Sequence, residues 1–279
     1  MSVSALPTTA PGVAAEMARQ AVAAHPDLIL AAGGDGTINE VVNGMAGSRI
    51  PLGVLPGGTA NVLATEIGLG SRMERVARQI QSCVPVRIAL GRLYQGGNPP
   101  RYFLLMAGVG LDAHVVSQVR SGWKSILGKG EYWLAGFSQL GKTLTEFEVR
   151  ANGQRFRAGF ALASRVRNYG GDLELARNVN LLEPHFELVL FSGANPFVYL
   201  KYLAAAAVGQ LERMNGVSVV RTRQAEFTSE EPVLIQVDGE LIGPLPARVE
   251  IVPDALTLLA PPQFHQRVGV RAGQALAPA

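Results

Sequence analysis

The sequence of 279 residues contains one cysteine, Cys83, and four widely separated histidines. A single thiol excludes a disulfide framework and any metal site built from several thiolates of one chain. No two histidines have the H-E-x-x-H spacing of zinc hydrolases, so an enzyme of that class is not expected. No uninterrupted apolar stretch approaches ~18 residues, and we therefore predict no membrane-spanning helix.

Strong charge of one sign is also lacking. The 25 Lys and Arg residues exceed the 22 Asp and Glu residues by three, which is too little for a dedicated nucleic-acid binder, and we expect no nucleic-acid partner. A mildly basic surface suits phosphate groups or an anionic membrane face. The alternative is that this small excess of basic residues has no particular partner. The segment Met1–Gly12 lacks the basic stretch and apolar run of a signal peptide, so we expect a cytoplasmic protein. The oligomeric state stays open, with a homodimer as one alternative.

Hydrophobic residues make up 48% of the chain and charged residues 17%, which is a globular composition with ample core. The first 90 residues alternate between two kinds of segment. Helical periodicity marks residues 13–24, 38–45, 61–67 and 73–80, and short apolar runs mark residues 28–32 and 52–55. Strands that alternate with helices predict an α/β domain with a parallel sheet.

From about Pro85 onward the pattern changes to alternation with period two, which predicts antiparallel strands. Asn152-Gly153 marks a hairpin turn between strands around Phe147 and Phe156. We also expect strands over 186–191, 226–237 and 249–252, and helices over 123–140 and 196–213. The predicted domains are therefore an α/β domain over 1–88, an antiparallel β domain over 89–262 and a fraying tail over 263–279.

Two glycine-rich junctions carry the clearest chemical signal. Gly36-Thr37-Ile38-Asn39 recurs 22 residues later as Gly58-Thr59-Ala60-Asn61, each time between a predicted strand and helix. Such junctions expose backbone N–H groups at the positive end of a helix, where phosphate binds. Asp35 would repel phosphate, which suggests Mg²⁺ or a hydroxyl that loses a proton. The structural alternatives are helix caps, by Asp35 or Thr37 at the first junction and by Thr59 at the second.

Three other motifs have weaker support. Residues 136–143 satisfy G-x-x-x-x-G-K-[ST], but a P-loop needs a strand before it and a helix after it, and neither is predicted. Residues 108–113 match G-x-G-x-x-A, with Glu131 at a plausible distance for a ribose partner, but the βαβ pattern does not follow. Asp238-Gly239 by itself predicts a hairpin turn.

Four motifs in this order resemble the diacylglycerol kinase catalytic family, in the bacterial lipid-kinase branch related to sphingosine and ceramide kinases. They are GGDGTINEVVNG (33–44), PLGVLPGGTANVLA (51–64), GVGLDA (108–113) and DGE (238–240). GGDGT is shared with NAD kinases, whereas the second and last motifs favour lipid kinases. The resemblance implies an N-terminal Rossmann-like, phosphofructokinase-like α/β domain and a C-terminal antiparallel β-sandwich. It also implies transfer of the γ-phosphate of ATP to a lipid such as diacylglycerol or a sphingoid base at a membrane surface, with Mg²⁺.

The resemblance further implies roles for individual residues. Asp238 and Glu240 would form the catalytic centre, with Glu240 favoured as the general base. Asp35 and Asp112 would belong to an acidic, Mg²⁺-linked network. The residues implied in nucleotide binding are Thr8, Gly33, Gly34, Asp35, Gly36, Thr37, Ile38, Asn39, Gly58, Thr59 and Asn61.

Three departures from the family pattern limit these implications. The first strand and its N-P-x-x-G loop are not seen before the first helix, so either the chain has an upstream start or it lacks part of the nucleotide site. Val62 stands where many members have Asp. Glu183-Pro184 replaces a D-G pair beside a structural Mg²⁺ site, whose positions match Asn180, Glu183 and His185.

Three functions therefore stay open: an ATP-dependent lipid kinase, an NAD kinase-like enzyme and a catalytically silent nucleotide-binding protein. Aromatic and basic residues between Arg120 and Trp133 suggest an interfacial lip for the lipid, with an ordinary packed amphipathic helix as the alternative.

Overall fold

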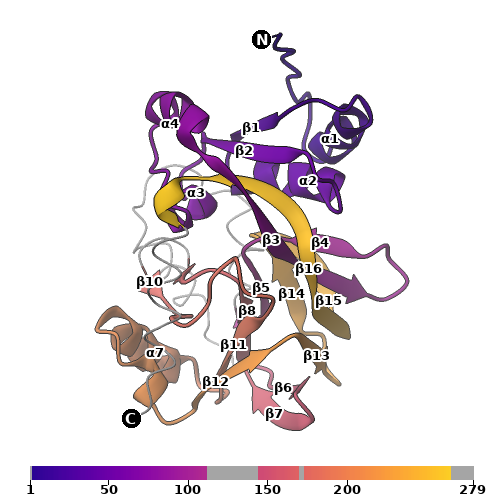
Figure 1. Ribbon diagram of the computed structural model, residues 1–279. Coiled ribbons are helices and arrows are strands. Elements are labelled where there is room, and N and C mark those ends of the chain that lie inside the picture. The colour runs from indigo at the N-terminus through magenta and orange to yellow at the C-terminus, as the bar shows by residue number, and fades with distance from the viewer. Residues whose placement is uncertain (1, 112–143, 170–172, 265–279) are drawn as a thin grey trace. The chain divides into compact units, whose positions relative to one another are not determined.

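The computed structural model describes residues 2–111, 144–169 and 173–264 (Figure 1). The chain divides into two compact units, of which unit 2 contains residues 91–251 and unit 1 contains the residues before and after it. Both divisions fall inside a strand, the first within β3 (Val84–Gln95) and the second within β16 (Ala247–Ala260).

Unit 1 has the predicted α/β architecture. Its strands β1 and β2 pair in parallel, and β2 pairs in parallel with β16 through Thr257 and Leu258. Leu52 and Val54 of β2 are fully buried, as expected for a short apolar strand inside a parallel sheet. The elements of this unit before β3 are α1 (Ala14–Ala23), β1 (Ile29–Gly33), α2 (Asp35–Met45), β2 (Pro51–Pro56), α3 (Val62–Glu66), α4 (Met73–Gln79) and the 3₁₀-helix η1 (Ile80–Ser82).

Unit 2 is built mainly from antiparallel strands. One sheet has the order β12-β11-β8-β5-β14-β15, and in a second sheet β16, β13, β6 and β7 are successive neighbours, with β3 paired to β4. The elements after β3 are β4 (Arg101–Phe103), β5 (Met106–Gly110), β6 (Phe147–Ala151), β7 (Gln154–Ala158), β8 (Phe160–Ser164), β9 (Asn168–Tyr169), β10 (Leu173–Glu174), β11 (Phe186–Phe191), α7 (Pro196–Ala207), η2 (Leu211–Arg213), β12 (Val217–Thr222), β13 (Gln224–Thr228), β14 (Leu234–Val237) and β15 (Glu240–Pro244).

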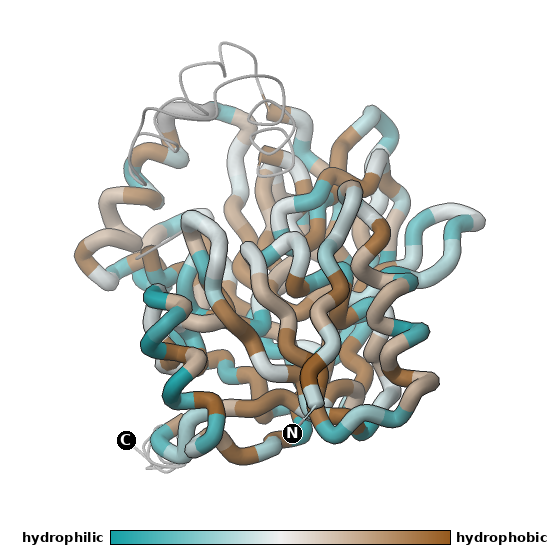
Figure 2. The backbone as a smooth tube through the Cα atoms, turned by 90° about the horizontal axis from the view of Figure 1, so that it is seen from above, coloured by the Kyte–Doolittle hydropathy of each residue, from teal (hydrophilic) through white to brown (hydrophobic). Residues whose placement is uncertain are grey.

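Side chains from both sheets of unit 2 form one hydrophobic core. Phe103 stacks on Phe186 with ring centroids 5.6 Å apart, and Phe147 meets Phe227 edge to face at 6.4 Å. Figure 2 shows hydrophobic stretches along the strands and hydrophilic residues on many of the turns that join them. Two sheets that share a core form a sandwich, so the predicted antiparallel β-sandwich is confirmed.

Three predicted elements are wrong in extent, and one of them, the strand expected over 249–252, is longer in the structure, where β16 runs over Ala247–Ala260. Residues 226–237 form two strands, β13 and β14, which belong to different sheets. The polar segment Ser229–Pro232 separates them, and proline cannot donate to a strand ladder. The helix expected over 196–213 ends at Ala207, and Gly209 follows with a left-handed φ of 71°.

None of the helices that the structure describes is both long enough and apolar enough to cross a membrane. Other predictions fall outside the described residues and receive no structural account. They concern Asp112, the helix over 123–140, the aromatic and basic residues 120–133, the motif over 136–143 and the tail after residue 264.

Candidate active site

The first glycine-rich junction leads from β1 into α2. Gly34 is extended, with φ −82° and ψ 175°, and the eleven-residue helix begins at the next residue. The first helical hydrogen bond joins the Ile38 N–H to the Gly34 carbonyl at 3.0 Å, so the N–H groups of residues 35–37 precede the intrahelical ladder. A Cβ added to Gly36 would meet no atom within 4 Å. This open backbone at the positive end of a helix is suited to a phosphate group.

The second glycine-rich loop packs directly on the first. The Gly57 N–H donates to the Gly33 carbonyl at 2.9 Å. A Cβ on Gly58 would lie 2.7 Å from the Gly34 Cα, closer than side chains approach a backbone. Glycine is therefore required here for packing as well as for the predicted approach of a phosphate, because only a residue without Cβ lets the two loops touch.

Asn61 fixes the shape of the second loop. The residue is buried and left-handed, with φ 47° and ψ 49°. Its Oδ1 accepts the Gly58 N–H at 2.9 Å, and its Nδ2 donates to the Gly58 carbonyl at 2.8 Å. Both polar atoms of the amide thus close the loop on itself, which gives Asn61 a positioning role.

Asp35 joins the two junctions through its carboxylate. Its oxygens accept the N–H groups of Val62 at 3.1 Å and Leu63 at 3.3 Å, so Asp35 caps the start of α3 from a distance of 27 residues along the chain. The capping alternative of the sequence is therefore realised on a different helix from the one expected. A role of Asp35 in an Mg²⁺-linked network stays a prediction.

The other residues predicted to contact the nucleotide fall into two groups. Thr8 and Thr59 are exposed, and Thr37 is half-buried in the first turn of α2. Ile38 and Asn39 are buried, with 1% and 3% of their surface exposed, so their side chains belong to the core of unit 1. Any phosphate contact at these two positions would have to come from the backbone.

Glu40 is a site residue that the sequence did not single out. Its two carboxylate oxygens accept the N–H groups of Gly12 at 2.8 Å and Ala14 at 3.1 Å, at the start of α1. The residue ends the GGDGTINE motif and so anchors α1 to the helix that opens at the first glycine junction. No local signal points to a partner 28 residues away.

In unit 2, the DGE motif forms the predicted tight turn, between β14 and β15. Asp238 and Gly239 have positive φ values of 47° and 81°, as a type I′ hairpin turn requires. The Asp238 carboxylate accepts three backbone N–H groups, from Leu104 at 2.7 Å and from Leu105 and Met106 at 2.9 Å. These bonds hold the chain between β4 and β5, and a catalytic role of Asp238 stays a prediction.

Glu240 begins β15 and faces Arg101 of β4. The pair is bidentate: Nη1 donates to Oε1 at 2.9 Å, and Nη2 forms an ion pair with Oε2. The Glu240 side chain remains 37% exposed and is therefore accessible to solvent. Arg101 carries no motif, and the sequence analysis did not identify it.

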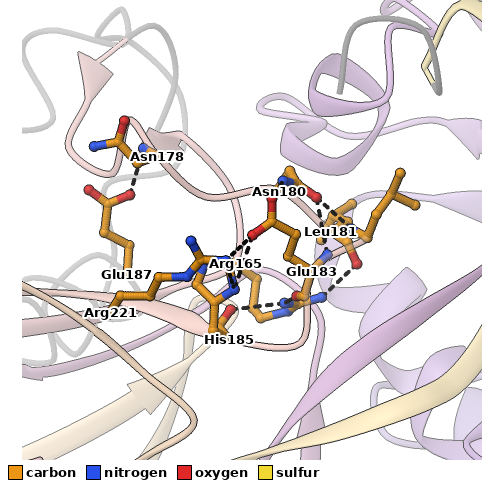
Figure 3. Close-up of polar contacts among 9 residues, drawn as sticks. Arg165, Asn178, Asn180, Leu181, Glu183, His185, Glu187 and Arg221 are labelled. Carbon is orange, nitrogen blue, oxygen red and sulfur yellow. Dashed lines mark hydrogen bonds and ion pairs between the residues drawn. The ribbon is translucent and has the colours of Figure 1, made fainter. Parts of the chain in front are cut away.

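The three residues matched to a structural Mg²⁺ site do lie together (Figure 3). Asn180 Nδ2 donates to Glu183 Oε1 at 2.8 Å, the other Glu183 oxygen forms an ion pair with Arg221, and Arg221 Nη2 lies 3.1 Å from His185 Nδ1. Burial, with a contribution from Arg221, lowers the pKa of His185 to about 4. Within the described ranges, no group of three or more His, Cys, Asp or Glu residues is arranged to hold a metal ion.

Comparison with known proteins adds to this geometry. The profile of the diacylglycerol kinase catalytic domain matches residues 1–93. A second profile, described as the YegS C-terminal NAD kinase beta sandwich-like domain, matches residues 106–260.

Whole-chain relatives agree with these matches. A diacylglycerol kinase of Bacillus subtilis is 32% identical over 247 residues, which cover 86% of this chain and 79% of that protein. One from Staphylococcus haemolyticus is 29% identical over 88% of this chain and 74% of its own. A crystal structure of a diacylglycerol kinase from Bacillus anthracis superposes with a TM-score of 0.73 at 22% identity, covering 92% of this chain and 85% of that chain.

Proposed function

Because the chain belongs to the diacylglycerol kinase family, we propose that it transfers the γ-phosphate of ATP to the hydroxyl of a lipid such as diacylglycerol or a sphingoid base. The observation that carries this proposal is the start of α2. Three N–H groups there precede the helical ladder, and Gly36 leaves the backbone open to a large anion.

The nucleotide would bind to unit 1 through backbone groups. Residues 33–37 would hold the phosphates, with Thr59 as a hydroxyl donor and the Asn61 amide keeping the second loop in shape. Mg²⁺ would enter with the nucleotide and neutralise the charge of its phosphates, which is its usual part in phosphoryl transfer.

Glu240 is the candidate general base. The acceptor hydroxyl would give its proton to a Glu240 oxygen, form a new O–P bond to the γ-phosphorus and release ADP as the old bond breaks. Each carboxylate oxygen has two lone pairs, so an oxygen that accepts an Arg101 N–H can also accept this proton. Arg101 would thus orient the base.

A lipid acceptor places the reaction at a membrane surface, where the enzyme would act as a peripheral protein. Diacylglycerol and sphingoid bases share a hydroxyl beside long acyl or alkyl chains.

The test is phosphate transfer by the purified 279-residue chain, with Mg·ATP and mixed micelles that carry each lipid in turn, and NAD as a soluble acceptor. We expect a phosphorylated lipid and no phosphorylated NAD. Phosphorylation of NAD alone would overturn the proposal, as would ATP binding with no transfer to any lipid.

The role of Glu240 is tested by Glu240→Gln with Glu148→Gln as a matched control. Glu148 is also an arginine-paired glutamate on a strand of unit 2, with 34% of its side chain exposed against 37% for Glu240. We expect kcat to fall by roughly 10²- to 10⁴-fold in the first variant, with ATP affinity retained, and to stay unchanged in the control. Equal turnover in both variants would refute the assignment.

A further inference from the structure

The loop that precedes β11 converges on one buried side chain. The guanidinium of Arg165, which follows β8, donates from Nη2 to the Leu181 carbonyl at 2.7 Å and from Nη1 to the His185 carbonyl at 3.0 Å. Nη1 also donates to the Glu183 carbonyl. Figure 3 draws the contacts of this guanidinium with the loop. Arg165 has 0% of its surface exposed and is the largest fully buried side chain of the described residues. Three carbonyl oxygens of one short loop thus face one cation.

The side chains of this loop are also engaged. Asn180 Oδ1 accepts the N–H groups of Leu182 at 3.0 Å and Glu183 at 3.1 Å, which shapes the turn. One carboxylate oxygen of Glu183 accepts a hydrogen bond from the Asn180 amide, and the other forms an ion pair with Arg221. His185 Nδ1 lies against Arg221. The oxygen atoms that could bind a metal ion therefore already have partners that are amides or guanidinium groups.

This donor set does not fit Mg²⁺. Magnesium requires near-octahedral oxygen coordination at ~2.0–2.1 Å and usually keeps several waters. The carbonyl oxygens here point at a guanidinium, whose positive charge would repel a second cation at the same place. The family resemblance matched Asn180, Glu183 and His185 to the positions of a structural Mg²⁺ site, and the observed contacts argue against an ion there.

The other end of the loop is held by a charge of opposite sign. Glu187 on β11 is 3% exposed, and its Oε2 accepts the Asn178 N–H at 2.6 Å. Carbonyl groups of residues 181–185 are thus bound by a buried cation, and a backbone N–H at residue 178 is bound by a buried anion. Both anchors are side chains of the chain itself.

We infer that Arg165 takes the place of a structural metal ion in this loop, so that the loop keeps its conformation without a divalent cation. Arginine is suited to this role because its planar fork can donate to several carbonyl oxygens at once. A lysine offers a single point charge on a flexible stem and would not span the three oxygens in the same way.

The test uses the full chain without nucleotide and needs no activity measurement. Thermal unfolding in excess EDTA and in millimolar Mg²⁺ should give the same Tm, and Mn²⁺ followed by electron paramagnetic resonance should show no bound ion that depends on Glu183. A Tm that rises with Mg²⁺ in the wild type, but not in Glu183→Gln, would overturn the inference.

The arginine itself is tested by Arg165→Met, with Arg221→Met as the matched control. Arg221 faces the same loop, but its side chain is 67% exposed. We expect Tm to fall by roughly 5–15 °C in Arg165→Met, because three carbonyl groups, two of them in fully buried hydrogen bonds, lose their donors, and by only ~0–3 °C in the control. An unchanged Tm for Arg165→Met would refute the inference. Should this variant not fold, the wild-type metal measurements decide the question by themselves.

Discussion

The three hydrogen bonds of Asp238 allow a sharp test of what this residue does. Oδ1 accepts the N–H groups of Leu105 and Met106, and Oδ2 accepts that of Leu104. Asp238→Asn preserves the size of the side chain and tolerates the left-handed φ of 47°. The amide oxygen of Asn can keep two of the three hydrogen bonds, but both would then go to an uncharged acceptor. The NH₂ group of Asn would face the Leu104 N–H, so that two donors would meet.

The cost follows from these contacts. Hydrogen bonds to a charged group contribute about 1.5–3 kcal/mol each, neutral ones about 1 kcal/mol, and a buried unpaired donor costs about 1–3 kcal/mol. Because Asn keeps two weakened bonds and loses one, we expect the free energy of unfolding to fall by about 2–4 kcal/mol. In a unit of this size that corresponds to a fall in Tm of roughly 5–15 °C.

Two further substitutions separate the carboxylate from the backbone conformation. Asp238→Gly removes all three bonds but favours positive φ, whereas Asp238→Ala removes them and adds the steric cost of a left-handed residue, about 1–2 kcal/mol. The expected order of stability is therefore wild type, Asn, Gly, Ala.

The assay is thermal unfolding by circular dichroism, together with hydrogen exchange of the backbone amides of residues 104–106. Faster exchange of these amides in Asp238→Asn would locate the damage in the segment between β4 and β5. A variant with wild-type Tm and wild-type protection of these amides, but without kinase activity, would refute the structural role and show Asp238 to be catalytic.

Three other perturbations give distinct results. Gly58→Ala should lower the free energy of unfolding by about 1–3 kcal/mol and weaken ATP binding, since its Cβ would lie 2.7 Å from the Gly34 Cα; unchanged ATP affinity by calorimetry would contradict this. Glu40→Ala should cost about 1–2 kcal/mol and speed hydrogen exchange at the start of α1; intact protection there would be inconsistent with the cap. The pKa of His185 is about 4 in the folded protein and 6.5 when unfolded, so the unfolded chain binds a proton more readily. The neutral His185 therefore contributes to the free energy of unfolding above pH 6.5, and this contribution is lost as the pH falls toward 4. In His185→Asn, the decrease in the free energy of unfolding between pH 6.5 and pH 4 should be smaller than in the wild type by about 1–3 kcal/mol. An identical pH profile for the two proteins would disprove the assignment.

The sequence predicted the elements whose signals are local. β1, β2 and the helices that follow them come from short apolar runs and glycine-rich ends, and the turns at Asn152-Gly153 and Asp238-Gly239 come from the preference of these pairs for positive φ. The unbroken strand over 226–237 was wrong because the apolar residues on either side of Ser229–Pro232 were read as one strand, whereas this polar segment, which ends in proline, is where the chain moves to another sheet.

The partners of the polar site residues were beyond prediction. Asp35 meets amides 27 and 28 residues away, and Asp238 meets amides more than 130 residues away, and these pairings exist only in the folded chain. Arg165 was harder still, because arginine is among the residues least often buried and nothing around it in the sequence marks it as a core residue.

The division of the chain inside β3 and β16 has a consequence for biosynthesis. The parallel sheet of unit 1 includes Thr257 and Leu258, which are made after the whole of unit 2. During translation, unit 2 can complete its sandwich before Thr257 and Leu258 are made, and until then Pro51 and Leu52 of β2 lack these strand partners. An unpaired strand edge is a site of aggregation, so a ribosome-bound chain that stops between Ile251 and Thr257 should depend on chaperones far more than the finished protein does.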